Sequence, residues 1–188
     1  MDYSEDEIRD IRQASKIYYP SVFYADLFDA MGKELFPSYH TDKCVQDKIK
    51  QTALFHLLEI PHPITRVFYG KRRMEKILRF FRFPLIAKIP RGSALGRGVF
   101  LIHDEEGLSA YLNQSSVAYI QEYLALDRDI RVVVIGDQVV HAYWRLAAEG
   151  EYRSNVALGG KISLKKIPPA ALSLALHTAR ACDWNDAV

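Results

Sequence analysis

A glycine-rich loop between two apolar runs constrains this chain more than any other stretch of its sequence. The runs Pro84–Ile89 and Val99–Ile102 are short and apolar, and they predict two buried strands. The connection between them contains Gly92, Gly96 and Gly98. Because glycine lacks a side chain, main-chain N–H groups of such a loop can approach an anion closely.

The same loop carries positive charge on Lys88, Arg91 and Arg97. Cations beside exposed main-chain N–H groups favour phosphate binding. A basic surface hairpin is the alternative that this stretch alone leaves open. The loop has no Gly-Lys-Ser/Thr ending of a P-loop, and Gly96-Arg97-Gly98 runs into a strand, where a dinucleotide fingerprint would open a helix.

The composition is that of an ordinary globular protein: 188 residues, of which 49% are hydrophobic and 26% charged. A net charge of +2 gives no indication of nucleic acid or of an anionic membrane as partner. No apolar run reaches the roughly 18 residues of a membrane span, and the acidic start Met1–Asp10 is the opposite of a signal peptide. Because Cys44 and Cys182 are isolated, we expect a reducing compartment and a cytoplasmic protein.

Helical and extended patterns are mixed along the chain. Apolar residues at helical spacing predict helices over Ser21–Lys33, Asp47–Ile60, Gly70–Phe81 and Pro168–Ala181. Further strands are expected over Lys16–Tyr19, Ile64–Tyr69, Val117–Leu124, Ile130–Ile135 and Gln138–Arg145, with a tight turn at Gly136-Asp137. Since hairpins replace strict alternation of strands and helices, the pattern predicts an α+β fold rather than a doubly wound sheet.

Charged residues that suit a nucleotide stand at the ends of these elements. Lys48 lies on a predicted helix, and Lys88 ends the strand before the glycine loop. Arg153 lies in a later polar loop, Glu149–Gly160. Two lysines and an arginine that converge on the glycine loop would match the negative charge of ATP, and an acid such as Asp129 can accept hydrogen bonds from ribose hydroxyl groups.

The order of these motifs resembles the ATP-grasp superfamily, in its RimK-like branch of carboxylate–amine ligases. The resemblance covers Cys44 to the carboxyl end, and its most specific part is DIRVVVIGDQVVHAYWR (Asp129–Arg145), followed by EGEYRSN (149–155) and Gly159-Gly160. It implies an α+β ATP-grasp fold in which two subdomains sandwich ATP. It also implies a partial preceding segment at 1–43 and an ATP-grasp domain at 44–188, divided into 44–122, with the glycine loop at 90–98, and an incomplete 123–188.

The resemblance also implies roles for individual residues. Lys48 and Lys88 would hold the α- and β-phosphates of ATP, and the mobile loop from Gly92 to Gly98 would close over the nucleotide; this loop includes Ser93 and Gly96. The segment between the subdomains would meet adenine through Gln121, Glu122, Tyr123 and Leu124. Asp129 would take the ribose, with Asp127 as the alternative. Arg153, Ser154 and Asn155 would lie by the γ-phosphate, with Arg153 stabilising charge during phosphoryl transfer.

The activity implied by the resemblance is ATP-dependent activation of a carboxylate to an acyl phosphate, followed by attack of an amine to give an amide, ADP and phosphate. The implied cofactors are ATP and Mg²⁺. An amino acid, a peptide or a protein tail all remain open as substrates, and so does a homo-oligomeric state. The chain ends at Val188, about where the resemblance places the strand with the first magnesium-binding acid, so we expect the metal ligands beyond Val188.

Two other classes of function stay open at this point. The missing metal acids favour a module that binds ATP without turnover. The stretch Arg66–Arg82 mixes basic residues with aromatic ones, as a nucleic-acid binder would, although a basic helix face with aromatic residues turned inward explains the same pattern.

Overall fold

The computed structural model describes residues 3–93, 98–148, 150–151, 154 and 159–187. The chain divides into two compact units. The larger unit comprises Gln46–Arg131 and Ala142–Pro168, and the smaller unit comprises Met1–Val45, Val132–His141 and Pro169–Val188.

The larger unit is built on an antiparallel sheet with the order β3-β6-β4-β5. Its strands are β3 (Thr65–Phe68), β4 (Leu85–Lys88), β5 (Val99–Ile102) and β6 (Ala118–Glu122). Its helices are α4 (Lys48–Leu57), α5 (Arg73–Phe80) and α6 (Glu105–Gln114). In this order β3 is an edge strand of the described sheet, whereas β4, which carries Lys88, lies between two neighbours.

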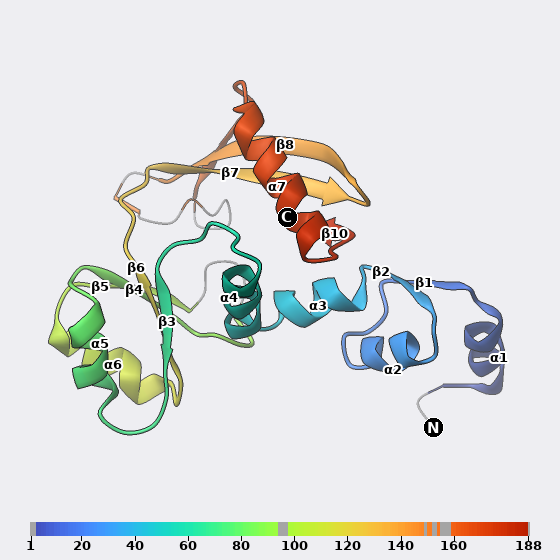
Figure 1. Cartoon of the computed structure of the whole chain (residues 1–188), viewed down its shortest axis with the longest axis horizontal. Helices are drawn as coiled ribbons and strands as arrows, with labels where there is room; N and C mark the ends of the chain where they lie inside the picture. Colours follow the sequence, from blue (N-terminus) through green and yellow to red (C-terminus); the bar gives the residue numbers. More distant parts are fainter. Residues whose placement is uncertain (1–2, 94–97, 149, 152–153, 155–158, 188) are drawn as a thin grey trace. The chain divides into compact units, whose positions relative to one another are not determined.

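Helices α5 and α6 cover one face of this sheet (Figure 1). Side chains of a strand alternate between its two faces, and the alternate residues Leu85, Ala87, Ala118 and Ile120 are fully buried beneath the two helices. Lys88 and Gln121 occupy the other positions of β4 and β6 and therefore lie on the opposite face of the sheet. The apolar core thus holds a rigid platform beneath the polar side chains.

The apolar side predicted for α5 is confirmed, because Ile77 and Phe81 are buried in this core and Met74 and Leu78 pack against it.

Helix α4 differs from α5 in how its side chains are buried. Asp47 caps its first turn by accepting hydrogen bonds from the N–H groups of Ile49 (3.0 Å) and Lys50 (3.3 Å). Although α4 carries apolar residues at helical spacing, none of its side chains is fully buried.

A long hairpin passes from the larger unit to the smaller one and back. It consists of β7 (Arg128–Ile135) and β8 (Gln138–Leu146), joined by the predicted turn at Gly136-Asp137, where Gly136 has a φ of +62°. In the larger unit β8 pairs with β9 (Lys161–Ser163), and in the smaller unit β7 pairs with β10 (Asp186–Ala187).

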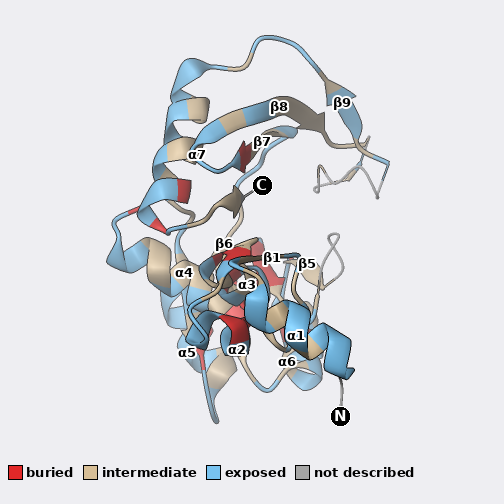
Figure 2. Cartoon of the chain, turned by 90° about the vertical axis from the view of Figure 1, so that its right-hand side faces the viewer, coloured by how far each residue is buried: buried red, intermediate tan, exposed pale blue. Residues whose placement is uncertain are grey.

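The smaller unit contains α1 (Glu5–Gln13), β1 (Lys16–Tyr18), α2 (Ala25–Ala30), β2 (Glu34–Phe36), α3 (Tyr39–Val45) and α7 (Pro169–Ala181). Strands β1 and β2 are parallel, and Ala25, Phe28 and Leu35 form a small core beside them. Asn185 ties the end of this unit to β2, since its side chain accepts the N–H of Ser38 (2.7 Å) and donates to the carbonyl of Leu35 (3.1 Å). Helix α1 is exposed along most of its length (Figure 2).

The predicted α+β class is confirmed. The expected helix over Ser21–Lys33 is shorter than predicted, because only Ala25–Ala30 is helical. The sequence patterns above did not predict α1, α3 and α6, nor the short strands β2, β9 and β10. Among the described residues, no helix has the length and apolar character that crossing a membrane requires.

Candidate functional site

The two predicted phosphate-binding lysines are both partly buried in the larger unit. Lys88 Nζ donates to Gln121 Oε1 at 2.8 Å, and Lys48 Nζ donates to the carbonyl (3.0 Å) and the hydroxyl (3.2 Å) of Ser93. Within the described part of the chain, neither lysine forms an ion pair with a carboxylate. The two ammonium groups are thus held by neutral oxygens, which an anionic ligand could supplement.

Electrostatics at these lysines favour an anion. Burial lowers the pKa of Lys88, and the nearby charge of Lys48 lowers it further. Burial also lowers the pKa of Lys48, although the adjacent Asp47 opposes this effect. Because the two cations repel each other, a negative group bound between them would stabilise both charged forms.

Asp47 and Arg91 hold Lys48 against the beginning of the glycine loop. Arg91 Nε lies 2.8 Å from an oxygen of the buried Asp47 carboxylate, and the N–H of Lys48 donates to the carbonyl of Pro90 at 3.0 Å. Burial acts to raise the pKa of Asp47, but the hydrogen bond from Arg91 and those from the Lys50 and Ile49 amides outweigh it, so this pKa is lowered. Arg91, which the sequence suggested as a phosphate cation, is therefore engaged with Asp47.

The glycine loop joins β4 to β5, as predicted. Gly92 and Gly98 have positive φ values of +66° and +74°. A Cβ at Gly98 would lie 3.0 Å from the Cβ of Ile89, so this position requires glycine for space as well as for conformation. Ser93 Oγ donates to the carbonyl of Ile89 at 3.0 Å, which places its own carbonyl beside Lys48. Gly96 lies outside the described residues.

Lys88 and the predicted adenine segment line one pocket of about 210 Å³ in the larger unit. The predicted residues in its wall are Lys88, Gln121, Glu122, Tyr123 and Leu124. Apolar side chains complete the wall, among them Ile86 and Val99. The structure thus brings five of the sequence-derived candidates, a lysine among them, together around a mainly apolar space.

The main chain of the adenine segment is partly committed to the fold. The N–H of Glu122 donates to the carbonyl of Ile64 at 2.9 Å, and the carbonyl of Leu124 accepts the N–H of Leu126 at 2.9 Å. The side chain of Glu122 accepts the N–H of Ile64 at 2.6 Å. The two bonds between Glu122 and Ile64 fix the segment beside the start of β3.

Asp129 and Ser154 form a second group with Arg145. Both oxygens of Asp129 lie 2.7 Å from guanidinium nitrogens of Arg145, and Ser154 Oγ donates to the same carboxylate at 2.5 Å. The Arg145 side chain is only 17% exposed. Asp127, the alternative ribose acceptor, is exposed and pairs with Arg128. Asp129 is not among the residues that line the 210 Å³ pocket, and Arg153 and Asn155 lie outside the described residues.

Sequence reasoning missed three residues that support these groups. The Tyr111 hydroxyl accepts the N–H of Tyr119 (3.0 Å) and donates to the carbonyl of Lys88 (2.7 Å), so it fixes the backbone that carries the lysine. Thr52 on α4 shares a hydrogen bond of 2.6 Å with the hydroxyl of Tyr119. Arg145 is the third. Each bonds to a partner that is distant in the sequence, so only the folded structure reveals its role.

Comparison with known proteins agrees with this geometry. A family model described as a RimK-like ATP-grasp domain matches residues 45–186. A "Probable alpha-L-glutamate ligase" of Chromohalobacter salexigens is 32% identical over 143 residues, which cover 72% of this chain and 47% of the relative. One of the same name from Parasynechococcus marenigrum is 30% identical over 161 residues, which cover 82% of this chain and 34% of the relative.

Solved structures share the fold at low sequence identity. A RimK domain ATP-grasp protein from Sphaerobacter thermophilus superposes with a TM-score of 0.68 at 18% identity, covering 88% of this chain and 61% of that one. D-alanine–D-alanine ligase from Bacillus anthracis gives a TM-score of 0.70 at 12% identity, and the match covers 97% of this chain and 66% of that one. The predicted ATP-grasp fold is thus confirmed, while the chain spans about half the length, or less, of the curated relatives it matches. The family match covers most of the sequence, and the chain belongs to the RimK-like ATP-grasp family.

Proposed function

We propose that this chain supplies the ATP-binding part of a carboxylate–amine ligase. The observation that carries the proposal is the pocket lined by Lys88 and by the segment from Gln121 to Leu124. Adenine would lie against the apolar wall and meet the carbonyl of Glu122 and the N–H of Leu124. Lys88 and Lys48, whose charges lack a carboxylate partner among the described residues, would meet the α- and β-phosphates.

The reaction that we propose has two steps. A substrate carboxylate oxygen attacks the γ-phosphorus of ATP, and ADP leaves with the bridging oxygen. An amine then attacks the acyl carbon, and phosphate leaves as the amide forms. Phosphoryl transfer depends mostly on positioning and on neutralisation of charge, which are the tasks that the two lysines and the loop amides would perform. The roles of Arg153, Ser154 and Asn155 at the γ-phosphate stay predictions, as does that of Asp129 at the ribose.

The described residues provide no all-protein cage for a magnesium ion. Mg²⁺ prefers carboxylate and other oxygen ligands in octahedral geometry, and no group of three or more His, Cys, Asp or Glu side chains gathers within the ranges that the structure describes. Mg²⁺ stays part of the proposal as a companion of ATP, and the steps above are assigned only to the chain's own residues.

Glutamate is the amine substrate that we propose, because the curated relatives are named probable alpha-L-glutamate ligases. A peptide or protein tail as acceptor gains support from a fold neighbour solved with its precursor peptide, the ATP-grasp ligase PsnB. We also propose the ATP-grasp boundaries given above, 44–122 and 123–188. A cytoplasmic location stays a prediction of the sequence.

Calorimetric titration of the whole chain with ATP and with adenosine tests the proposal. We expect Lys88→Ala to weaken ATP binding at least about tenfold, roughly 1.4 kcal/mol, because it removes a phosphate contact. Adenosine binding should change little, since the apolar wall is intact. Lys76→Ala is the matched control, because Lys76 is exposed on α5 and does not line the pocket. Equal ATP affinity in the parent chain and the Lys88 variant would refute the proposed site.

A further inference from the structure

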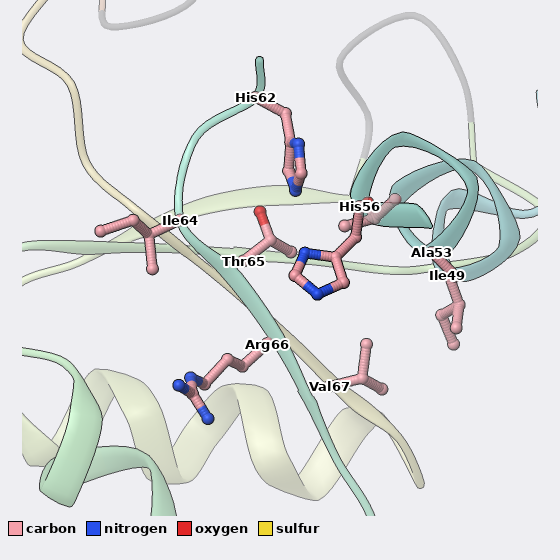
Figure 3. A pocket seen from close by; sticks show the side chains of 9 residues that line it. Ile49, Ala53, His56, His62, Ile64, Thr65, Arg66 and Val67 are labelled. Atoms are coloured by element: carbon pink, nitrogen blue, oxygen red, sulfur yellow. The ribbon is translucent and has the colours of Figure 1, made fainter. Parts of the chain in front are cut away.

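A second and larger pocket, of about 560 Å³, lies in the larger unit between α4 and β3 (Figure 3). Its volume falls within the range of about 300–1,000 Å³ that is typical of binding pockets. None of the residues assigned above to ATP lines it. The residues that do are Ile49, Thr52, Ala53, His56, His62, Ile64, Thr65, Arg66 and Val67. We refer to this pocket as the α4–β3 groove.

The pattern of lining residues shows that the groove follows the edge of a strand. Ile64 to Val67 are consecutive, and all of them contribute to the wall. Because neighbouring side chains of a strand point to opposite faces, a cavity that touches every one must run along the strand's edge. On α4 the lining positions are 49, 52, 53 and 56, which form one face of a helix.

The edge of β3 presents main-chain groups to this groove. The N–H of Glu122 donates to the carbonyl of Ile64, so these two residues form a hydrogen-bonded pair of the antiparallel ladder. Since such pairs alternate along the ladder, Arg66 also faces β6, whereas the N–H and C=O groups of Thr65 and Val67 point away from it. In the described sheet β3 has no second neighbour, so these groups face the groove.

Apolar side chains of the α4 wall are incompletely covered by the described residues. Ile49 and Ala53 line the groove, yet no side chain of α4 is fully buried. Ile64, at the entrance of β3, is 63% exposed. A strand edge that faces an unfilled helix face is the geometry in which extended peptides add to a sheet, with main-chain bonds to the strand and side chains in the adjoining pocket.

The charge of the groove selects the kind of peptide. Of the described residues that line it, none is acidic, whereas Arg66, His56 and His62 are basic. The guanidinium of Arg66 stacks 4.1 Å from the ring centre of Phe80, which holds it at the strand without neutralising it. Figure 3 shows the rings of His56 and His62 directed into the same space beside Thr65, and their centres are 6.4 Å apart. His62 Nδ1 lies 2.7 Å from the carbonyl of Ile60, which orients the ring.

We propose that the α4–β3 groove binds an extended acidic peptide segment of about four residues, the length of β3, as an added strand. Acidic side chains would meet Arg66 on one face of the added strand. On the other face, apolar side chains would meet Val67, Ile49 and Ala53. This inference is independent of ATP binding, because the groove shares no residue with the pocket beside Lys88.

The test uses fluorescence anisotropy of a labelled six-residue peptide that alternates Glu and Val, added to the whole chain without nucleotide. Two comparison peptides separate the contributions: one alternates Lys and Val, and the other keeps Glu and Val but is N-methylated at alternate main-chain nitrogens. We expect only the unmodified acidic peptide to bind, because methylation removes the donors that an added strand requires. Equal binding of the methylated peptide, or no binding of the acidic one, would overturn the proposal.

Variants locate the contact. We expect Arg66→Glu to weaken binding at least about tenfold and the groove-filling Ala53→Trp to abolish it, whereas Lys76→Glu, an equal change of charge on exposed α5, should alter it less than about twofold. Circular dichroism confirms that each variant is folded. An equal loss in the Lys76 and Arg66 variants would reject the groove in favour of unspecific charge attraction.

Hydrogen exchange gives a readout specific to the register. The added strand should protect the amides of Thr65 and Val67 and leave that of Arg66, already directed at β6, nearly unchanged. Protection of these amides by self-association at high protein concentration without peptide would instead assign the edge to a second copy of the chain. Displacement of the peptide by an oligonucleotide at matched ionic strength would assign it to nucleic acid. Either result would overturn the proposal.

Discussion

Lys88 and Lys48 carry their charges where water has limited access, and this makes them sensitive to pH and to anions. A lysine whose pKa is lowered by folding destabilises the folded chain at neutral pH, where it is protonated in both states. This destabilisation is relieved as the pH rises from the lowered pKa of the folded chain toward the ordinary lysine pKa of 10.5. In this range the unfolded chain holds more protons than the folded chain. A bound polyphosphate would offset the same cost at neutral pH.

We therefore expect ATP affinity to fall with rising pH, and the fall should begin below the ordinary lysine value of 10.5 because both pKa values are lowered. The phosphates of ATP are already ionised in this range, since their second pKa is about 6. The loss of ATP affinity therefore reports deprotonation of the lysines. Calorimetry from pH 7.5 to 10 measures it. Lys48→Ala should raise the pKa of Lys88, which side-chain NMR can follow, because the variant removes a neighbouring positive charge. A Lys88 pKa that does not rise in this variant would contradict the coupling.

Asp129 offers a second prediction at the residue scale. We expect Asp129→Asn to lower the free energy of unfolding by about 1–3 kcal/mol, because the largely buried Arg145 loses a charge-assisted bidentate partner. Asp127→Asn, which touches only an exposed ion pair, should cost less than about 1 kcal/mol. Urea denaturation measures both. ATP titration of the same two variants decides between the two ribose acceptors.

At the scale of elements, the glycine loop shows how a short connection positions a site. Gly92 and Gly98 both have positive φ, but only Gly98 is also crowded, by Ile89 and Ser93. We expect Gly92→Ala to destabilise the chain by about 1–2 kcal/mol through backbone strain alone. Gly98→Ala should cost more, because its Cβ would also displace Ile89. Urea denaturation measures the free energy of unfolding of both variants. Equal losses in the two would mean that the loop relaxes around the new side chain at Gly98.

Sequence patterns were sufficient for the elements with strong periodicity. The runs around β4, β5 and β6 and the amphipathic α5 lie within about three residues of their expected places. The apolar patterns did not predict helix α1, because it buries no residue. Ser4 and Glu7 form a capping box, which the sequence could have indicated. Strands β2, β9 and β10 are too short to show a period of two.

The candidate site was predictable only in part, for a related reason. Resemblance placed Lys88 with the segment Gln121–Leu124, and the pocket brings these residues together. Tyr111 supports Lys88 from 23 positions away, and Arg145 holds Asp129 from 16. Such partners depend on how helices and strands pack, so spacing along one element cannot reveal them.

At the scale of the whole molecule, the two compact units place the proposed ATP contacts unequally. Lys48, Lys88 and the segment Gln121–Leu124 all belong to the larger unit. The two tryptophans are divided: Trp144 belongs to the larger unit and Trp184 to the smaller one. Trp144 lies beside Arg128, with the guanidinium 5.5 Å from its ring, so its fluorescence should report the folding of β7 and β8 in that unit.

We expect ATP to stabilise the larger unit selectively, because a ligand stabilises only the folded structure that binds it. In a Trp184→Phe variant, the denaturation midpoint reported by Trp144 should rise with ATP, corresponding to about 2.7 kcal/mol when ATP is a hundredfold above its dissociation constant. In a Trp144→Phe variant, the midpoint reported by Trp184 should move less. Lys88→Ala should remove the first shift. Because the units have separate cores, a shift carried by Trp184 alone would place ATP in the smaller unit and contradict the site proposed at Lys88.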